Sequence, residues 1–234
     1  KSLFSEIENA APERGLALVA AQFPGHVTFS SSLGQEDQVI TDMIFSEQLP
    51  VSVFTIDTGR LFTETYELID RTHARYGRHI RVYFPETADV EAFVTQKGIN
   101  GFYDSAENRK TCCHIRKVKP LGRALAGMKV WITGLRAGQS ANREQMPVLA
   151  WDETWQLYKY NPLINWSFRD VSAYLEKNRV PYNTLHDRGF PSIGCAPCTR
   201  AVTEGEDARA GRWWWETSQK ECGLHPVTKN ITHE

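Results

Sequence analysis

The sequence lacks the features of a membrane protein and of a strongly basic protein. No apolar run in its 234 residues approaches the roughly 20 that span a bilayer, and no signal-peptide pattern is present. The net charge is −1, with 27 Lys and Arg against 28 Asp and Glu, which excludes a strongly basic nucleic-acid-binding protein. We therefore expect a cytoplasmic protein that binds neither a membrane nor a nucleic acid.

Two phosphate-binding fingerprints are also missing. Neither G-x-x-x-x-G-K-[ST] nor G-x-G-x-x-G occurs, so a Walker site and a dinucleotide fingerprint are excluded. The chain has five cysteines, and an odd number argues against a closed disulfide framework. In a reducing compartment, clustered cysteines more often bind a metal or do redox chemistry.

The chain does contain alternating strand and helix patterns over its first 135 residues. β-branched and aromatic runs predict strands at 26–32, 51–57, 79–85 and 129–135. Two short helices are expected at the start, the second beginning at Pro12, and helical spacing predicts further helices at 35–48, 63–77 and 88–98. This alternation predicts an α/β fold, a mostly parallel central sheet with helices on both faces.

The pattern changes beyond Leu149. Residues 149–163 suggest a strand pair, and Ser167 with Asp170 forms a capping-box pattern at the start of a helix. The last 45 or so residues show little periodicity. We divide the chain into an α/β nucleotide-binding region, 1–194, and an irregular C-terminal extension, 195–234, and interpret the two as one domain overall.

Four of the cysteines form two close pairs. Cys112 and Cys113 are adjacent in "RKTCCHIRKVK", and a disulfide between neighbours would be strained. Cys195 and Cys198 form a C-x-x-C, which suits a metal centre or a dithiol redox pair. Together the pairs supply the four thiolates that an iron–sulfur cubane or a tetrahedral zinc needs. For Cys195 and Cys198, the alternative is two unrelated buried cysteines with no chemical role.

Geometry and charge favour the iron–sulfur cluster over zinc. Adjacent cysteines fit one small ion poorly, whereas a wider cubane offers two separate irons to neighbouring residues. A cluster held by four thiolates is a net anion, and basic residues surround the cysteine pair: Arg109, Lys110, Arg116, Lys117 and Lys119. An ordinary solvated basic face is the alternative explanation for these five.

The fifth cysteine, Cys222, lies in the polar segment "KECGLHP". Gly223 and Pro226 flank it, so we expect a mobile tail rather than a core position. A cysteine in such a tail is a candidate nucleophile or redox thiol, with Lys220 or His225 available to lower its pKa.

Anion-binding features follow the predicted strands. "FSSSLGQED" places Ser31, Ser32 and Gly34 at a helix start, where hydroxyls and backbone N–H groups favour phosphate or sulfate. Asp57 and Gly59 lie at the end of the second strand, where open α/β sheets bind ligands. Two arginine pairs are suited to bind an anionic substrate: Arg136 with Arg143, and Arg209 with Arg212. The members of the second pair are three residues apart, so they would share one face if the segment is helical.

Taken together, these motifs resemble one enzyme family. "SSSLGQED", "IDTGRLFTET", "TCCHIRKVKPL", "ITGLRAGQS", "GCAPCTRAV", "ARAGRWWWE" and "KECGLH" occur in order between about residues 26 and 225, as in the assimilatory adenylyl-sulfate reductases. These belong with the phosphoadenylyl-sulfate (PAPS) reductases, in the adenine nucleotide α-hydrolase-like group.

The resemblance implies a reaction, a cofactor and a partner. The substrate would be adenosine 5′-phosphosulfate, reduced to sulfite and AMP, with thioredoxin as reductant in sulfate assimilation. Cys222 would attack the substrate sulfur to give an S-sulfocysteine. The four paired cysteines would hold a [4Fe–4S] cluster.

The resemblance also implies substrate contacts. Lys117 would join the cluster region to the substrate's sulfate. The serine loop and Gly134 would surround the nucleotide, and Arg143, Arg209 and Arg212 would hold its phosphate and sulfate oxygens.

One departure and three rival functions stay open. Leu33 stands where many adenylyl-sulfate enzymes have a smaller polar residue. In this respect the loop resembles that of the PAPS reductases. PAPS reductase is thus the nearest alternative, although its members mostly lack the four cluster cysteines. The others are an ATP pyrophosphatase or tRNA-thiolating enzyme, whose S-G-G-x-D-S loop is absent, and a non-catalytic zinc module. The sequence leaves the oligomeric state open, a homo-oligomer included.

Overall fold

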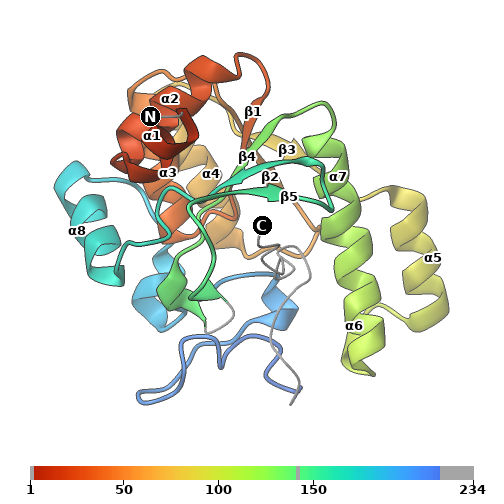
Figure 1. Ribbon diagram of the computed structural model, residues 1–234. Helices are drawn as coiled ribbons and strands as arrows, with labels where there is room; N and C mark the ends of the chain where they lie inside the picture. Colours follow the sequence, from red (N-terminus) through yellow and green to blue (C-terminus); the bar gives the residue numbers. More distant parts are fainter. Residues whose placement is uncertain (1–2, 141–142, 217–234) are drawn as a thin grey trace.

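The computed structural model describes residues 3–140 and 143–216, and its centre is a six-stranded sheet of order β3-β2-β1-β4-β6-β5 (Figure 1). Every neighbouring pair is parallel except β5–β6, which is antiparallel. The strands are β1 Val27–Ser30, β2 Ser52–Ile56, β3 Arg81–Tyr83, β4 Val130–Ile132, β5 Leu149–Asp152 and β6 Leu157–Tyr160. The prediction of a mostly parallel sheet is confirmed.

The helices lie between the strands, largely where the sequence predicts them. The second begins at Pro12, and α4 ends at Gly77, whose φ of 62° is a left-handed conformation that glycine adopts without strain. The α-helices are α1 Leu3–Asn9, α2 Pro12–Gln22, α3 Gln35–Ser46, α4 Thr63–Tyr76, α5 Thr87–Lys97, α6 Ala106–Cys113, α7 Lys119–Leu125 and α8 Phe168–Asn178. The described residues contain no helix long and apolar enough to cross a membrane.

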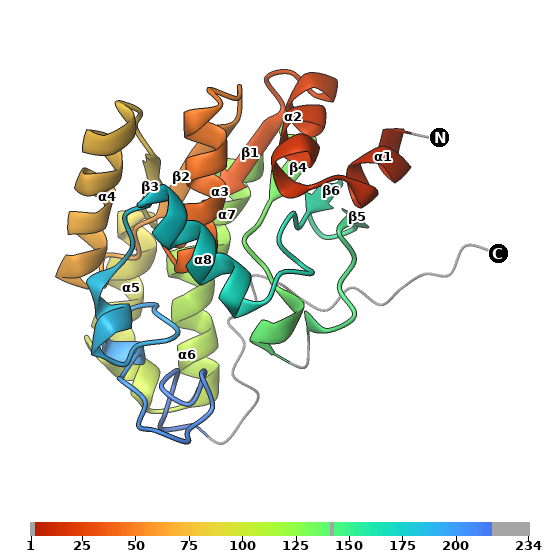
Figure 2. The same cartoon turned by 90° about the vertical axis from the view of Figure 1, so that its left-hand side faces the viewer.

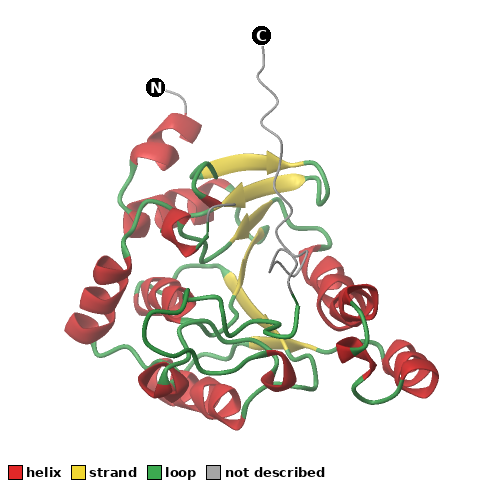
Figure 3. Cartoon of the chain, turned by 90° about the horizontal axis from the view of Figure 1, so that it is seen from below, coloured by secondary structure: helices red, strands yellow, loops and turns green. Residues whose placement is uncertain are grey.

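Helices cover both faces of the sheet because neighbouring strand residues point to opposite sides. On one face, Phe29, Val53 and Ile132 pack in the main core, which also contains buried residues of α2, α3, α4 and α8. On the other face, Phe54 and Trp131 pack against α7. Figure 3 shows the strands between these two sets of helices, and Figure 2 shows α3 and α4 standing side by side.

The hairpin and the capping box after Leu149 are both present. β5 pairs with β6 across the predicted 149–163 segment, and β6 also adds a parallel neighbour to β4. At α8, the Ser167 side chain accepts from the Asp170 N–H, and Asp170 accepts from the Ser167 N–H.

Residues 106–125 form a continuous helical path that we did not predict. In it α6 passes through a five-residue π-helix, η2 His114–Val118, into α7. The reason is that apolar periodicity is weak here, since α6 contacts the irregular C-terminal segment rather than the sheet. That segment carries the short 3₁₀ turn η6 Ala196–Cys198 and lies beside α6 in Figure 1. Another 3₁₀ turn, η5 Thr184–Arg188, precedes it.

Candidate functional site

A cavity of about 970 Å³ opens at the carboxyl ends of β1, β2 and β4. This volume is at the upper end of the range for ligand pockets, about 300–1,000 Å³. Five cationic side chains line it among the described residues: Lys117, Arg136, Arg143, Arg209 and Arg212. It is therefore suited to an anionic ligand of nucleotide size.

The serine loop forms one wall of this cavity and is held by a buried carboxylate. Ser31, Ser32 and Gly34 all line the cavity, as the sequence suggested. The Ser32 backbone N–H and hydroxyl both donate to Asp37 Oδ2 at 2.6 Å, and the Ser31 Oγ accepts the Leu33 N–H at 3.1 Å. Burial raises the Asp37 pKa to about 6 against the lowering effect of the Ser32 bonds. We did not predict Asp37, although its place one turn into the helix after a serine loop is the signal that would have found it.

Gly134 lies in the cavity wall and in contact with the same carboxylate. A Cβ added at Gly134 would overlap Asp37 Oδ1 and come within 3.3 Å of the Asp37 backbone nitrogen. Glycine is therefore the residue that allows the loop after β4 to approach the start of α3.

The exit from β2 presents a different residue from the two that we predicted. Asp57 and Gly59 do not line the cavity, whereas Thr58 does. Asp57 Oδ1 accepts the Gly59 N–H at 2.7 Å, and the Tyr66 hydroxyl donates to both Asp57 oxygens at 2.9 and 3.0 Å. Asp57 and Gly59 thus shape the turn that points Thr58 inward.

The arginines reach the cavity from two segments, the connection between β4 and β5 and a turn near the C-terminal end of the described residues. Arg136 donates to Glu36 Oε1 at 2.7 Å, and Arg143, which is buried, donates to Gln139. Arg209 and Arg212 are joined by a turn in which the Arg212 N–H donates to the Arg209 carbonyl at 2.9 Å, and they lie outside any assigned helix. They still reach one cavity, so the helix that we considered is not needed to bring them together.

The four paired cysteines line a second, smaller cavity next to the first. Phe102, Pro197 and Trp213 complete its apolar wall. Its cationic lining consists of Arg60, Arg109, Arg116 and Lys117. Of the five basic residues that we expected here, Lys110 and Lys119 do not line it: Lys110 is exposed, and Lys119 donates to Asp89 at 2.8 Å. Arg60 was not predicted, because it lies far away in the sequence.

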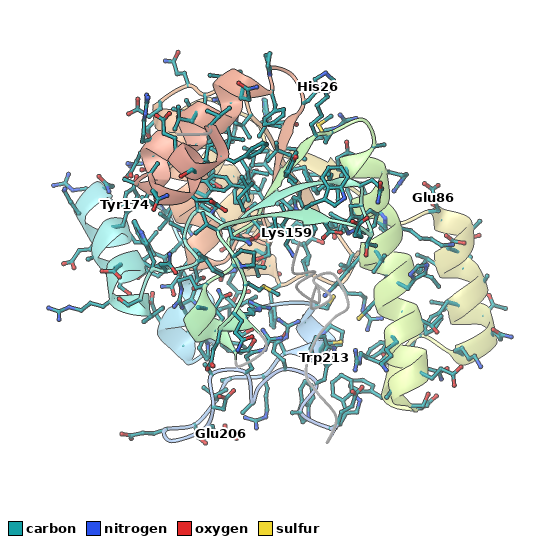
Figure 4. All side chains as sticks on the ribbon, in the orientation of Figure 1. His26, Glu86, Lys159, Tyr174, Glu206 and Trp213 are labelled. Atoms are coloured by element: carbon teal, nitrogen blue, oxygen red, sulfur yellow. The ribbon has the colours of Figure 1, made fainter. Side chains whose placement is uncertain are left out.

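Lys117, Cys195 and Trp213 line both cavities and so form the wall between them. Lys117 belongs to the π-helix η2, which alters the helical phase directly after Cys113. Single π-turns of this kind occur frequently at functional sites. Figure 4 places Trp213 beside α6, at the base of the C-terminal segment.

The thiols differ in their electrostatic environment. Burial acts to raise the pKa of Cys195, but Lys117, the Thr58 hydroxyl at 3.2 Å and Arg212 together lower it below its usual value. Burial raises the pKa of Cys112, against the lowering effect of Arg116, and it raises the pKa of Cys198 to about 12. Cys195, at the shared wall, is therefore the position that favours a thiolate.

In the residues that the structure describes, no three Cys, His, Asp or Glu side chains are arranged to hold a single metal ion. Cys222, the predicted nucleophile, lies outside the described residues.

The sequence-family model of the phosphoadenosine phosphosulfate reductase domain matches residues 26–201 of this chain. An adenosine 5′-phosphosulfate reductase from Allochromatium vinosum is 54% identical over 200 residues, which are 85% of this chain and 78% of that protein. One from Agrobacterium fabrum is 52% identical over 202 residues, 86% of this chain and 78% of that protein.

Solved structures show the same fold. A PAPS reductase from Candida auris, crystallised in complex with phosphate, superimposes with a TM-score of 0.72 at 30% identity. The match covers 86% of this chain and 96% of that one. An FMN adenylyltransferase from Candida glabrata reaches a TM-score of 0.56 at 15% identity, over 97% of this chain and 80% of that one, which is a likeness of fold alone.

Proposed function

We propose that this chain, which belongs to the phosphoadenosine phosphosulfate reductase family, reduces adenosine 5′-phosphosulfate to sulfite and AMP. One observation carries the proposal. Lys117 and Cys195 line both a four-thiol cavity and a larger, cationic cavity at the carboxyl ends of the strands. The four-thiol cavity and the cavity that we assign to the nucleotide therefore share one wall.

The larger cavity supports a nucleotide phosphosulfate as the substrate. Breaking the bond between sulfate and phosphate leaves negative charge on both products, so the site must place cations on both sides of that bond. Lys117 and Arg212 come from the thiol side of the cavity, whereas Arg143 comes from the loop after β4. We assign these three, with Arg209, to the phosphate and sulfate oxygens, and the serine loop with Gly134 to the nucleoside side.

We assign the four cysteines to a [4Fe–4S] cluster. Soft thiolates are the ligands that iron–sulfur clusters take, and three of the four thiols are at most 8% exposed. The buried Trp213 Nε1 has no hydrogen-bond acceptor among the described residues, which fits an acceptor that enters with the cluster. When bound, the cluster supplies a compact anion that balances Arg116 and Lys117.

In this proposal, Cys222 is the nucleophile of the reaction. Its thiolate attacks the sulfate sulfur, the S–O bond to AMP breaks, and AMP leaves with the bonding electron pair. The product is an S-sulfocysteine. A thiolate of a dithiol protein such as thioredoxin then attacks the Cys222 sulfur, which releases sulfite and forms a mixed disulfide. The second thiol of the dithiol protein attacks its own sulfur in that mixed disulfide, so the bond to Cys222 breaks and the Cys222 thiolate is regenerated. Sulfur gains two electrons, and the dithiol loses two.

PAPS reduction is the second candidate, favoured by the structural likeness to the Candida auris enzyme. The relatives at 52–54% identity carry the other name, adenosine 5′-phosphosulfate reductase. The four thiols around one cavity also favour the reduction of adenosine 5′-phosphosulfate, since PAPS reductases mostly lack the cluster cysteines.

The experiment uses protein purified without oxygen. Iron, acid-labile sulfide and visible absorbance are measured first, followed by turnover of the two nucleotides with thioredoxin. We expect about four iron and four sulfide per chain, and faster turnover of adenosine 5′-phosphosulfate. Cys222→Ser should keep the iron and lose turnover. Zinc in place of iron would contradict the cluster, and faster turnover of the 3′-phosphorylated nucleotide would reverse the substrate assignment.

A further inference from the structure

We propose that Lys159 is a positioning residue of the larger cavity, where it acts through the Trp131 ring and, together with Arg143, strengthens the binding of an anionic nucleotide. Lys159 lies in β6 and pairs with Trp131 of β4 in the parallel register, so the two side chains share one face of the sheet. Figure 4 labels Lys159 near the centre of the molecule. The inference rests on the proposed function, because it adds a residue that favours the nucleotide from behind the cavity wall.

The Lys159 side chain is a buried cation. It is 7% exposed, and in the part of the chain that the structure describes its ammonium group forms no hydrogen bond or salt bridge. The group lies instead over the Trp131 ring, 5.0 Å from the ring centre. A cation that is buried and held by an aromatic face is costly to keep in the fold. We therefore infer that the charge serves the site rather than the stability of the sheet.

Trp131 connects Lys159 to the cavity. The ring packs with Phe54 and Leu121 on the α7 face of the sheet, and all three side chains line the cavity. Trp131 Nε1 donates to Ser30 Oγ at 2.7 Å, and Ser30 also lines the cavity. The ring is thus held by a hydrogen bond at its edge and by a cation at its face. Lys159 itself does not line the cavity, so it acts from behind this ring.

Arg143 connects Lys159 to the charge of the cavity. Burial lowers the pKa of Lys159 to about 8, while Asp152 of β5 acts to raise it and Arg143 acts to lower it. Asp152 is 2% exposed, and its Oδ1 accepts the N–H groups of Thr154 and Trp155 at 3.0 and 3.1 Å. Arg143 lines the cavity, so an anion bound there reduces the repulsion between the two cations.

Nucleotide binding and protonation of Lys159 are therefore linked. The anion binds more tightly while Lys159 is charged, and by reciprocity the bound anion raises the affinity of Lys159 for its proton. This gain in nucleotide affinity is present below the Lys159 pKa of about 8 and is lost as the pH rises through that value. A nucleotide phosphate, with a second pKa of about 6, does not titrate in the same range.

The main test measures AMP affinity by isothermal titration calorimetry at pH 7 and pH 9.5. We expect Lys159→Met, which replaces the ammonium group by an uncharged end, to weaken binding about fivefold at pH 7, because one favourable Coulombic interaction is lost. The wild-type affinity should fall toward that of the variant at pH 9.5. Lys159→Arg, which stays charged, should bind tightly at both pH values. The control is Lys129→Met, at an exposed lysine directly before β4, and it should match wild type.

Two further readouts separate this role from a structural one. At pH 8, titrations in buffers of different ionisation enthalpy should show that wild type takes up about 0.3 more protons per bound AMP than Lys159→Met does. The midpoint of urea unfolding at pH 7 should be no lower in Lys159→Met, since a buried cation without an ion pair does not stabilise the fold. An unchanged AMP affinity in Lys159→Met at pH 7, a loss that persists in full at pH 9.5, or equal proton uptake would overturn the proposal.

The outcomes distinguish this inference from the proposed function. If wild type binds AMP with the expected pH dependence but does not reduce adenosine 5′-phosphosulfate, the proposed function fails and the role of Lys159 stands. If wild type reduces the nucleotide while the pH profiles of AMP affinity are parallel in wild type and Lys159→Met, the inference alone fails. An absence of AMP binding by wild type would overturn both.

Discussion

The sheet and the thiol lobe, which we define as residues 102–118 and 195–216, are stabilised in different ways. The main core on the sheet is aliphatic and aromatic, with Phe29, Ile40 and Ile132 each 0% exposed. The apolar cluster of the lobe contains only two fully buried aromatic rings, Phe102 and Trp213, beside three buried cysteines. The sheet can therefore fold by burial of apolar surface, whereas the lobe has little such surface of its own.

Buried charge sharpens the difference. In the sheet region, Asp42 is 5% exposed and accepts hydrogen bonds from the hydroxyls of Tyr76 at 2.6 Å and Tyr174 at 2.8 Å. In the lobe, Arg109 and Arg116 are 2% and 8% exposed beside four thiols. Arg109 is paired with Glu216, so it is the buried Arg116 cation that gains most when the thiols are ionised or bound to a metal. We therefore expect that the fold and the site can be disrupted separately.

The largest effect is expected from Cys198→Ser in the lobe. Loss of one of the four thiols should remove iron and sulfide and reduce turnover to background, because the buried cations lose their anionic partner. The sheet should persist, with far-UV circular dichroism close to wild type. Full iron content with normal turnover in this variant would show that the lobe does not depend on the four thiols.

The matching change in the sheet is Phe29→Ala. This side chain is 0% exposed in β1, so its removal should lower the free energy of unfolding by about 3–5 kcal/mol. Urea unfolding measures the change, and iron per folded chain should stay constant. Phe84→Ala, at a side chain that is 56% exposed, is the control and should change stability little. A loss of iron in folded Phe29→Ala would mean that the two regions are not independent.

The sequence predicted the sheet better than the lobe for the same physical reason. β-branched runs and helical spacing report burial against a sheet, and they placed β1, β2 and β4 within a few residues. The path through α6 and η2 was missed because its inward side faces thiols, arginines and a tryptophan instead of an apolar surface. Arg60 was missed because its role comes from contacts that the tertiary fold creates, whereas Asp37 binds Ser32, five residues away, and could have been found from the sequence.

Individual site residues show the same limit. Asp57 and Gly59 were predicted from their place after a strand, but which of three consecutive residues points inward depends on the turn, and the turn directs Thr58 into the cavity. Arg209 and Arg212 reach the cavity through a turn, where a helix seemed the simplest arrangement. The motifs indicated which segments come together at the cavity. The backbone geometry determines which side chains line it.

The next prediction concerns Asp37, a buried charge where the sheet meets the substrate cavity. Its pKa is raised by burial from 3.8 to about 6, so the folded state binds the proton more tightly than the unfolded chain does. The stabilisation from this proton is complete below pH 4 and is lost as the pH rises through about 6. The unfolding free energy of wild type relative to Asp37→Asn should fall by up to about 3 kcal/mol between pH 4 and pH 7.5. Parallel pH profiles would show that Asp37 titrates normally.

The smallest effect is expected from Gly134→Ala, which acts on the same carboxylate without changing any charge. The new methyl group would overlap Asp37 Oδ1, so either the carboxylate or the loop after β4 must move. Overpacking of this kind costs about 1–3 kcal/mol, and here it should appear as a weaker affinity for AMP.

Isothermal titration calorimetry measures that affinity, and Gly25→Ala is unsuitable as a control because its φ is +74°. Gly122→Ala is better suited, since Gly122 does not line the cavity and a Cβ there would lie 3.2 Å from the Trp155 ring. If both variants bind AMP like wild type, the wall between β4 and α3 is not part of the nucleotide site, and the cationic wall beside the thiol lobe must supply the affinity alone.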